Sequence, residues 1–168
     1  MLKLIILLLM MPIVAGMGST SDVSYDEDQL EFLKNLTFTD LEGDEQSLEM
    51  FEDKVVLIDV WETWCTPCLM SFPHLDELQE TFEDDFVLLA LNPLMMDDKE
   101  TVEQFIDEHD YNFVYGYNEE IAEKLGISSI PYKIYMGPNG EFIETKIGNQ
   151  GPDADYETTR EIIEEYGK

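Results

Sequence analysis

A buried strand that runs into a closely spaced pair of cysteines constrains this chain more than any other feature. Residues 55–60, VVLIDV, are apolar apart from Asp59 and suit a strand that is covered on both faces. A Cys-x-x-Cys motif follows at Cys65 and Cys68, and apolar residues then recur at helical spacing. We therefore predict that strand changes to helix at Cys65. Free N–H groups and the helix dipole favour a thiolate at such a helix N-terminus.

The two cysteines are the only ones among 168 residues, so no disulfide framework holds this fold together. A bond between them closes a very small ring, which stabilises a fold by only about 2 kcal/mol. Such a bond is better explained as one that is made and broken in use. A zinc site needs about four ligands, and the only histidines are His74 and His109. We predict redox chemistry, with no metal and no cofactor.

The remaining hydrophobic pattern predicts one α/β domain with a central mixed sheet flanked by helices. We expect the strands at 55–60 and 86–91 to be parallel, joined by a right-handed crossover, and the last two strands to form an antiparallel hairpin. The other predicted elements are a short edge strand within 30–40, helices at 98–109, after Asn118 and at 153–166, and strands at 113–117, 132–136 and 141–147.

The N-terminus has the layout of a targeting segment. Lys3 precedes an apolar run of eleven residues, and small residues follow up to Gly18. The run is too short for an ordinary membrane span, so Met1–Gly18 is read as a signal peptide or an uncleaved N-terminal anchor. Ser19–Gln29 is an acidic flexible tether, and 30–168 is the folded domain. We predict an exported protein that meets a membrane only through an uncleaved leader.

The net charge excludes one class of partner. The chain carries 38 acidic against 9 basic residues, for a formal charge of −29. Such a surface repels phosphate backbones, so nucleic acid is not an expected partner. Two explanations of the charge stay open: a strongly solvated surface suited to solubility or high salt, and a surface that selects basic partners.

The segment 61–68, WETWCTPC, is similar to the active site of the thioredoxin superfamily. Residues 41–43, 55–58 and the extra helix and strand at 98–117 resemble the TlpA/ResA-type extracytoplasmic thiol–disulfide oxidoreductases. The resemblance covers about residues 30–166 and implies a thioredoxin-like fold with a helix-strand insertion and an N-terminal extension. It also implies a monomeric reductase that exchanges disulfides with proteins and receives electrons from an upstream donor. Several relatives serve cytochrome c maturation, but no residue here specifies that task.

The resemblance assigns roles within the motif. Cys65 is the accessible nucleophile that forms a mixed disulfide with the partner, and the more buried Cys68 resolves it. Asp59 matches the buried acid that shuttles the second proton, and burial would raise its pKa; the alternative is a partly solvated strand residue. Thr66 and Pro67 lie between the cysteines and are expected to contact the partner. Thr66 replaces the acid that some relatives carry.

Further partner contacts are implied outside the motif. Trp64 covers the cysteines, and the backbone of Ile130 is placed to pair with an extended segment of the partner. Pro131 matches the cis-proline position of the family, although an ordinary trans turn also fits the sequence. Gly148 matches the glycine of the substrate groove.

Glu62 departs from the family pattern, which has a small apolar residue three positions before the nucleophile. We expect Glu62 to lie on a solvated edge; the alternative is a charge that raises the pKa of Cys65.

The residue at position 62 also helps to distinguish two alternative functions. A thiol peroxidase of this fold would have Thr or Ser there and Pro in place of Ile58, and a copper carrier would space its cysteines differently and add a histidine.

Overall fold

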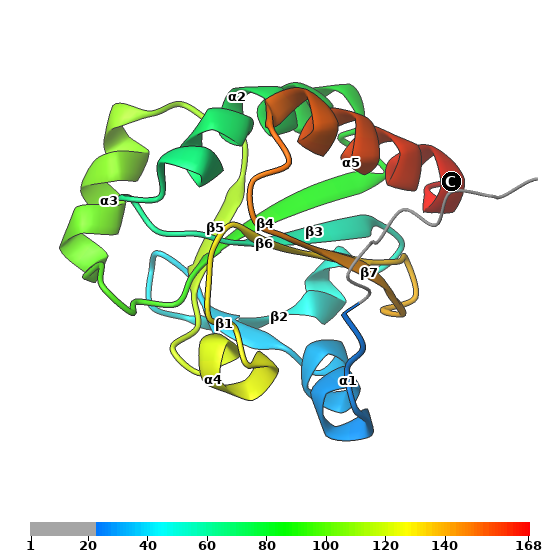
Figure 1. The fold of residues 1–168 in the computed structure, drawn as a ribbon, viewed down its shortest axis with the longest axis horizontal. Coiled ribbons are helices and arrows are strands. Elements are labelled where there is room, and N and C mark those ends of the chain that lie inside the picture. Colours follow the sequence, from blue (N-terminus) through cyan, green and yellow to red (C-terminus); the bar gives the residue numbers. More distant parts are fainter. Residues whose placement is uncertain (1–22) are drawn as a thin grey trace, which may run out of the picture.

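A seven-stranded mixed sheet forms the centre of the molecule in the computed structural model, which describes residues 23–168 (Figure 1). β3 pairs in parallel with β4 and antiparallel with β6, and the β6–β7 hairpin closes that side of the sheet. From one edge to the other the strands are β2 (Glu45–Ser47), β1 (Thr37–Thr39), β5 (Val114–Tyr117), β4 (Phe86–Asn92), β3 (Val55–Val60), β6 (Tyr132–Met136) and β7 (Phe142–Ile147).

Helices cover both faces of the sheet (Figure 1). One face carries α2 (Thr66–Thr81), α3 (Lys99–Glu108) and α5 (Pro152–Tyr166), and the other carries α1 (Glu27–Lys34) and α4 (Ile121–Leu125). A short 3₁₀ helix, η1 (Leu48–Phe51), precedes β3. Because both faces are covered, every residue of β3 and β4 is buried, which explains their continuous apolar sequences.

The main predictions of the fold are confirmed. The sheet is mixed, β3 and β4 are parallel, and the last two strands form an antiparallel hairpin. The predicted helix after Asn118 is present as α4, whose first N–H groups donate to the Asn118 side chain and which ends at a left-handed Gly126. The inserted α3 and β5 lie between β4 and α4 along the chain.

The N-terminal part of the domain differs from the prediction. Glu27–Lys34 forms α1, where the sequence predicts the end of a tether and the start of an edge strand. A capping box between Asp26 and Gln29 starts the helix, and Leu33 is buried on its inner side. The strand is limited to β1, and β2 lies outside it at the sheet edge. The predicted leader falls outside the described residues.

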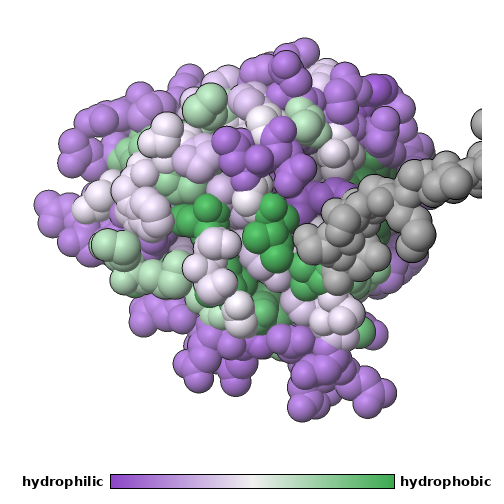
Figure 2. Space-filling model, in the orientation of Figure 1, coloured by the Kyte–Doolittle hydropathy of each residue, from purple (hydrophilic) through white to green (hydrophobic). Residues whose placement is uncertain are grey.

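The surface is strongly divided by polarity. Figure 2 shows hydrophobic residues gathered near the middle of one face, with hydrophilic residues around its margin. Across residues 23–168, no helix is both long and apolar enough to cross a membrane.

Candidate active site

The two cysteines lie where β3 gives way to α2, as the sequence predicts. Cys65 is the N-cap residue of α2, and it forms a disulfide with Cys68 across a Cα–Cα distance of 5.3 Å. Pro67 occupies the first turn of the helix, where its missing N–H leaves no helical bond unmade. The Cys68 N–H donates to Cys65 Sγ over 3.3 Å, so a backbone donor points at the sulfur of Cys65.

The accessibility of Cys65 differs from the prediction. Cys65 is only 2% exposed in this oxidised form, and Cys68 is fully buried as expected. Both cysteines belong to the apolar core that contains Trp61 and Phe72. The sequence cannot show this, because burial of the first cysteine depends on side chains brought from other parts of the chain.

The residues expected to contact a partner lie at the same end of the sheet. Val60, the last residue of β3, pairs with Tyr132, so the preceding Ile130–Pro131 segment sits beside the chain that leads to Cys65. The Ile130–Pro131 peptide bond is cis. Gly148, with a φ of 78°, donates its N–H to the Pro131 carbonyl over 2.9 Å. Its left-handed backbone conformation favours glycine.

The side chains in and beside the Cys-x-x-Cys motif differ in their exposure to solvent. Trp64 is 53% exposed, so it stands at the surface next to the buried disulfide. Thr66 is also exposed, whereas Pro67 is half-buried.

Asp59 is fully buried on the face of β3 that packs under α2. It alternates with Leu57 and Trp61, which share the core that contains Cys68. Lys133 lies directly opposite on β6, with Nζ 3.5 Å from Asp59 Oδ2. Neither carboxyl oxygen of Asp59 has a hydrogen bond. Burial raises the pKa of Asp59 to about 6; Lys133 opposes this shift and the nearby Asp155 adds to it.

Three members of this buried cluster, Lys133, Asp155 and Ser71, were not predicted. Lys133 is 1% exposed, and its Nζ also lies 3.3 Å from Oδ2 of Asp155, which is 3% exposed. Ser71, one turn after Cys68, donates its hydroxyl to the same Asp155 oxygen over 2.5 Å. The sequence carried one signal, a lone lysine inside an apolar strand. Nothing in the sequence distinguished Asp155 from the other acidic residues of the last helix.

Glu62 is not on a solvated edge; it is fully buried. One carboxylate oxygen accepts the Trp64 indole Nε1–H over 2.7 Å, and the other accepts the backbone N–H groups of Met96 at 2.7 Å and Asp97 at 3.3 Å. The loop after β4 folds over this side chain and supplies those donors. The prediction failed because the donors are distant in sequence.

Three comparisons with known proteins agree with this geometry. The family model described as AhpC/TSA family matches residues 31–143. The chain belongs to the AhpC/TSA family. It is 28% identical to the thiol-disulfide oxidoreductase ResA of Bacillus cereus over 98% of this chain and 92% of that protein. It is 34% identical to a thioredoxin of Rickettsia bellii, over 66% of this chain and 81% of that protein.

The solved structures agree on the fold. The thioredoxin domain of the thiol-disulfide oxidoreductase BVU-2223 from Bacteroides vulgatus superposes with a TM-score of 0.66 at 23% identity, covering 76% of this chain and 92% of that one. The predicted resemblance to the thioredoxin superfamily and its ResA-like members is therefore confirmed, together with the fold and the class of enzyme, a thiol–disulfide oxidoreductase.

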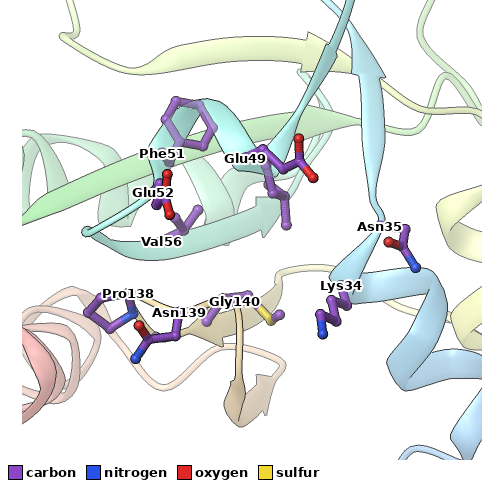
Figure 3. Close-up of a pocket in the computed structure, with 12 residues that line it drawn as sticks. Lys34, Asn35, Glu49, Phe51, Glu52, Val56, Pro138, Asn139 and Gly140 are labelled. Carbon is purple, nitrogen blue, oxygen red and sulfur yellow. The ribbon is translucent and has the colours of Figure 1, made fainter.

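A pocket of about 470 Å³ lies at the opposite end of β3 from the cysteines. Phe51 and Val56 line one side, and Asn139 and Lys34 line the other (Figure 3). It shares no residue with the disulfide or the Asp59 cluster. Within the described part of the chain, no three His, Cys, Asp or Glu side chains are grouped so that they could hold a metal ion.

Proposed function

We propose that this enzyme is an exported reductase that transfers electrons to the disulfides of other proteins through Cys65 and Cys68. The observation that supports this most is the disulfide itself, formed at the N-terminus of α2 directly after the strand that carries buried Asp59. The relatives named as thiol-disulfide oxidoreductases support the exchange chemistry. Export rests on the leader-like sequence of residues 1–18, and the reductase direction rests on the resemblance to ResA-type proteins.

The first step is attack by Cys65. In the reduced protein, the Cys68 N–H and the N-terminus of α2 stabilise the Cys65 thiolate. This sulfur attacks one sulfur of the partner's disulfide, a mixed disulfide forms, and one partner thiolate leaves. Because Cys65 is nearly buried when oxidised, its sulfur must become accessible as a partner binds.

The second step releases the partner. Cys68 passes its proton to Asp59, and its sulfur attacks the Cys65 sulfur. The mixed disulfide breaks, the second partner thiolate takes up a proton, and the electron pair of the dithiol has moved to the partner. A pKa of about 6 keeps Asp59 mostly ionised at neutral pH and close enough in basicity to return the proton.

The reduction potential of the Cys65–Cys68 couple tests the direction. We expect a value at or below about −270 mV, the range of reducing thioredoxins, and a value near about −120 mV would instead make the protein an oxidant. Potentials are read by equilibrating the protein with dithiothreitol or glutathione buffers and trapping free thiols. Consumption of hydrogen peroxide by the reduced protein, measured in parallel, tests the thiol peroxidase alternative.

The partner, the electron donor and the site of action follow from the same proposal. The enzyme acts outside the cytoplasm as a monomer on protein thiols and disulfides, and an upstream dithiol donor returns it to the reduced form. Detection of the mature N-terminus after residue 18 in an exported fraction tests both the leader and the location.

A further inference from the structure

Buried Glu62 joins the segment before Cys65 to the loop after β4. The two carboxylate oxygens accept hydrogen bonds from different segments. Oε2 accepts the Trp64 indole N–H, and Oε1 accepts the backbone N–H groups of Met96 and Asp97. Hydrogen bonds to a charged acceptor are stronger than those between neutral groups. The carboxylate therefore fixes the Trp64 ring and the Met96 backbone relative to each other.

Asp97, on the loop after β4, in turn accepts hydrogen bonds from the segment before Cys65. Its carboxylate accepts the Thr63 backbone N–H over 2.6 Å and the Thr63 hydroxyl over 2.8 Å. It also accepts the side-chain amide of buried Asn92 over 2.9 Å. The carboxylates of Glu62 and Asp97 thus both form hydrogen bonds that join residues 62–64 to residues 96–97. None of these groups takes part in the proton or electron transfers proposed above.

The two braced segments present apolar side chains to solvent. Trp64 is 53% exposed, Met95 48% and Met96 78%. Large apolar residues at such exposure beside a reactive disulfide favour a contact surface over a fold requirement. Tryptophan brings a large rigid area, and methionine adapts to varied shapes. We call Trp64, Met95 and Met96 the apolar rim.

We propose that Glu62 is a positioning residue that holds the apolar rim in place and thereby selects the polypeptides whose disulfides reach Cys65. The occupant that fits is a cationic segment with an apolar side chain next to its cysteine. The apolar side chain packs on the rim, and the positive charge meets exposed acids such as Asp98 and Glu100 on a protein of net charge −29. The inference rests on the proposed function.

The test compares a peptide with a small disulfide that has the same leaving group. The peptide is Lys-Leu-Cys with its thiol in a mixed disulfide with thionitrobenzoate, and the small probe is mercaptoethanol in the same mixed disulfide. Reduced protein converts each probe into two thiols and becomes oxidised, and the released thionitrobenzoate is followed by its colour. Wild type, Glu62→Gln and the matched control Glu83→Gln are measured. Glu83 is exposed and lies just before the start of β4, at the end of the sheet opposite the cysteines.

We expect Glu62→Gln to raise KM for the peptide about tenfold, the scale of one hydrogen bond to a charged group, with its limiting rate unchanged. The small probe should react within about twofold of wild type, because it does not reach the rim. Glu83→Gln should follow wild type on both probes. Equal slowing of both probes by Glu62→Gln, no effect on either, or the same effect from Glu83→Gln would each overturn the inference. Failure of wild type on the small probe would instead contradict the proposed function.

Trp64→Phe provides a second variant on an exposed residue, in case Glu62→Gln does not fold. It keeps an aromatic ring and removes the N–H that bonds to Glu62, so KM for the peptide should rise while the small probe is unaffected. Acrylamide quenching adds a spectroscopic readout, since the chain has two tryptophans and Trp61 is fully buried. In Glu62→Gln the quenchable emission of Trp64 should increase, and an unchanged quenching curve would contradict the positioning role.

Discussion

Asp59 and Glu62 are three residues apart and both fully buried, yet their surroundings are opposite. Asp59 has no hydrogen bond to either oxygen, and its pKa is raised to about 6. Glu62 accepts three hydrogen bonds from groups on two segments. The first environment suits a group that changes its protonation state, and the second suits a fixed acceptor. Burial alone therefore does not decide what a carboxyl group does.

The difference follows from where each residue stands relative to β3. Asp59 lies inside the strand, where the neighbouring backbone N–H groups already donate to the β4 and β6 ladders. Glu62 lies two residues beyond the strand, where the loop after β4 still has free N–H groups to offer. Asp59, inside the strand, therefore has no hydrogen bond, whereas Glu62, beyond the end of the strand, has three.

The largest expected effect comes from removing the cation near Asp59. Lys133→Met leaves Asp59 and Asp155 buried without their shared positive charge, and breaking a buried ion pair on one side destabilises by about 3–5 kcal/mol. Because Lys133 lowers the pKa of Asp59, the pKa of Asp59 should rise further in this variant. Urea unfolding at pH 7 measures the first effect, and carboxyl NMR titration the second. An unperturbed stability would show that the cluster is not ionised as assigned.

The next effect is the pH dependence of stability caused by Asp59. Folding raises its pKa from 3.8 to about 6, so its stabilising contribution is complete below about pH 4 and is lost as the pH rises through about 6. Asp59→Asn should therefore match wild type near pH 4 and become more stable by up to about 3 kcal/mol at pH 7. The measurement is the difference in unfolding free energy between the two proteins across that range. A constant difference would contradict the raised pKa.

The smallest change in stability is expected at Asp97, in the hydrogen-bonded network that contains Glu62. Asp97→Asn keeps one acceptor oxygen and loses part of its bonding to Thr63 and Asn92, which should cost about 1 kcal/mol. Urea unfolding at pH 7 measures this cost, and a loss as large as that of Lys133→Met would remove the contrast.

The sequence predicted the fold and the position of the cysteine pair within it well. The apolar run of β3, the cysteines at the start of α2 and the hairpin of β6 and β7 are each determined by neighbouring residues, so local patterns identify them. The burial of Asp59 was also predicted, because it is the one polar residue in an apolar strand. The helix at Glu27–Lys34 begins at a capping box between Asp26 and Gln29, a local signal that the prediction of a tether and an edge strand leaves out.

Contacts between distant segments could not be predicted. Lys133 meets Asp59 only because β6 pairs with β3, and Asp155 meets both only because α5 packs on the same face. Glu62 was expected in solvent because its donors are more than thirty residues away. The burial of Cys65 has the same cause. Each of these features depends on tertiary packing, which one sequence does not record.

The most direct test of the account is the pH dependence of the resolving step. A mixed disulfide between Cys65 and a peptide is formed, and its breakdown by Cys68 is timed from pH 5 to 8 in wild type, Asp59→Asn and Glu62→Gln. We predict a rise with an inflection near the pKa of Asp59, about 6, in wild type and Glu62→Gln. Asp59→Asn should lack that inflection and be slower by about a hundredfold at pH 7, the usual contribution of a positioned base. The same profile and rate in Asp59→Asn as in wild type would contradict the account.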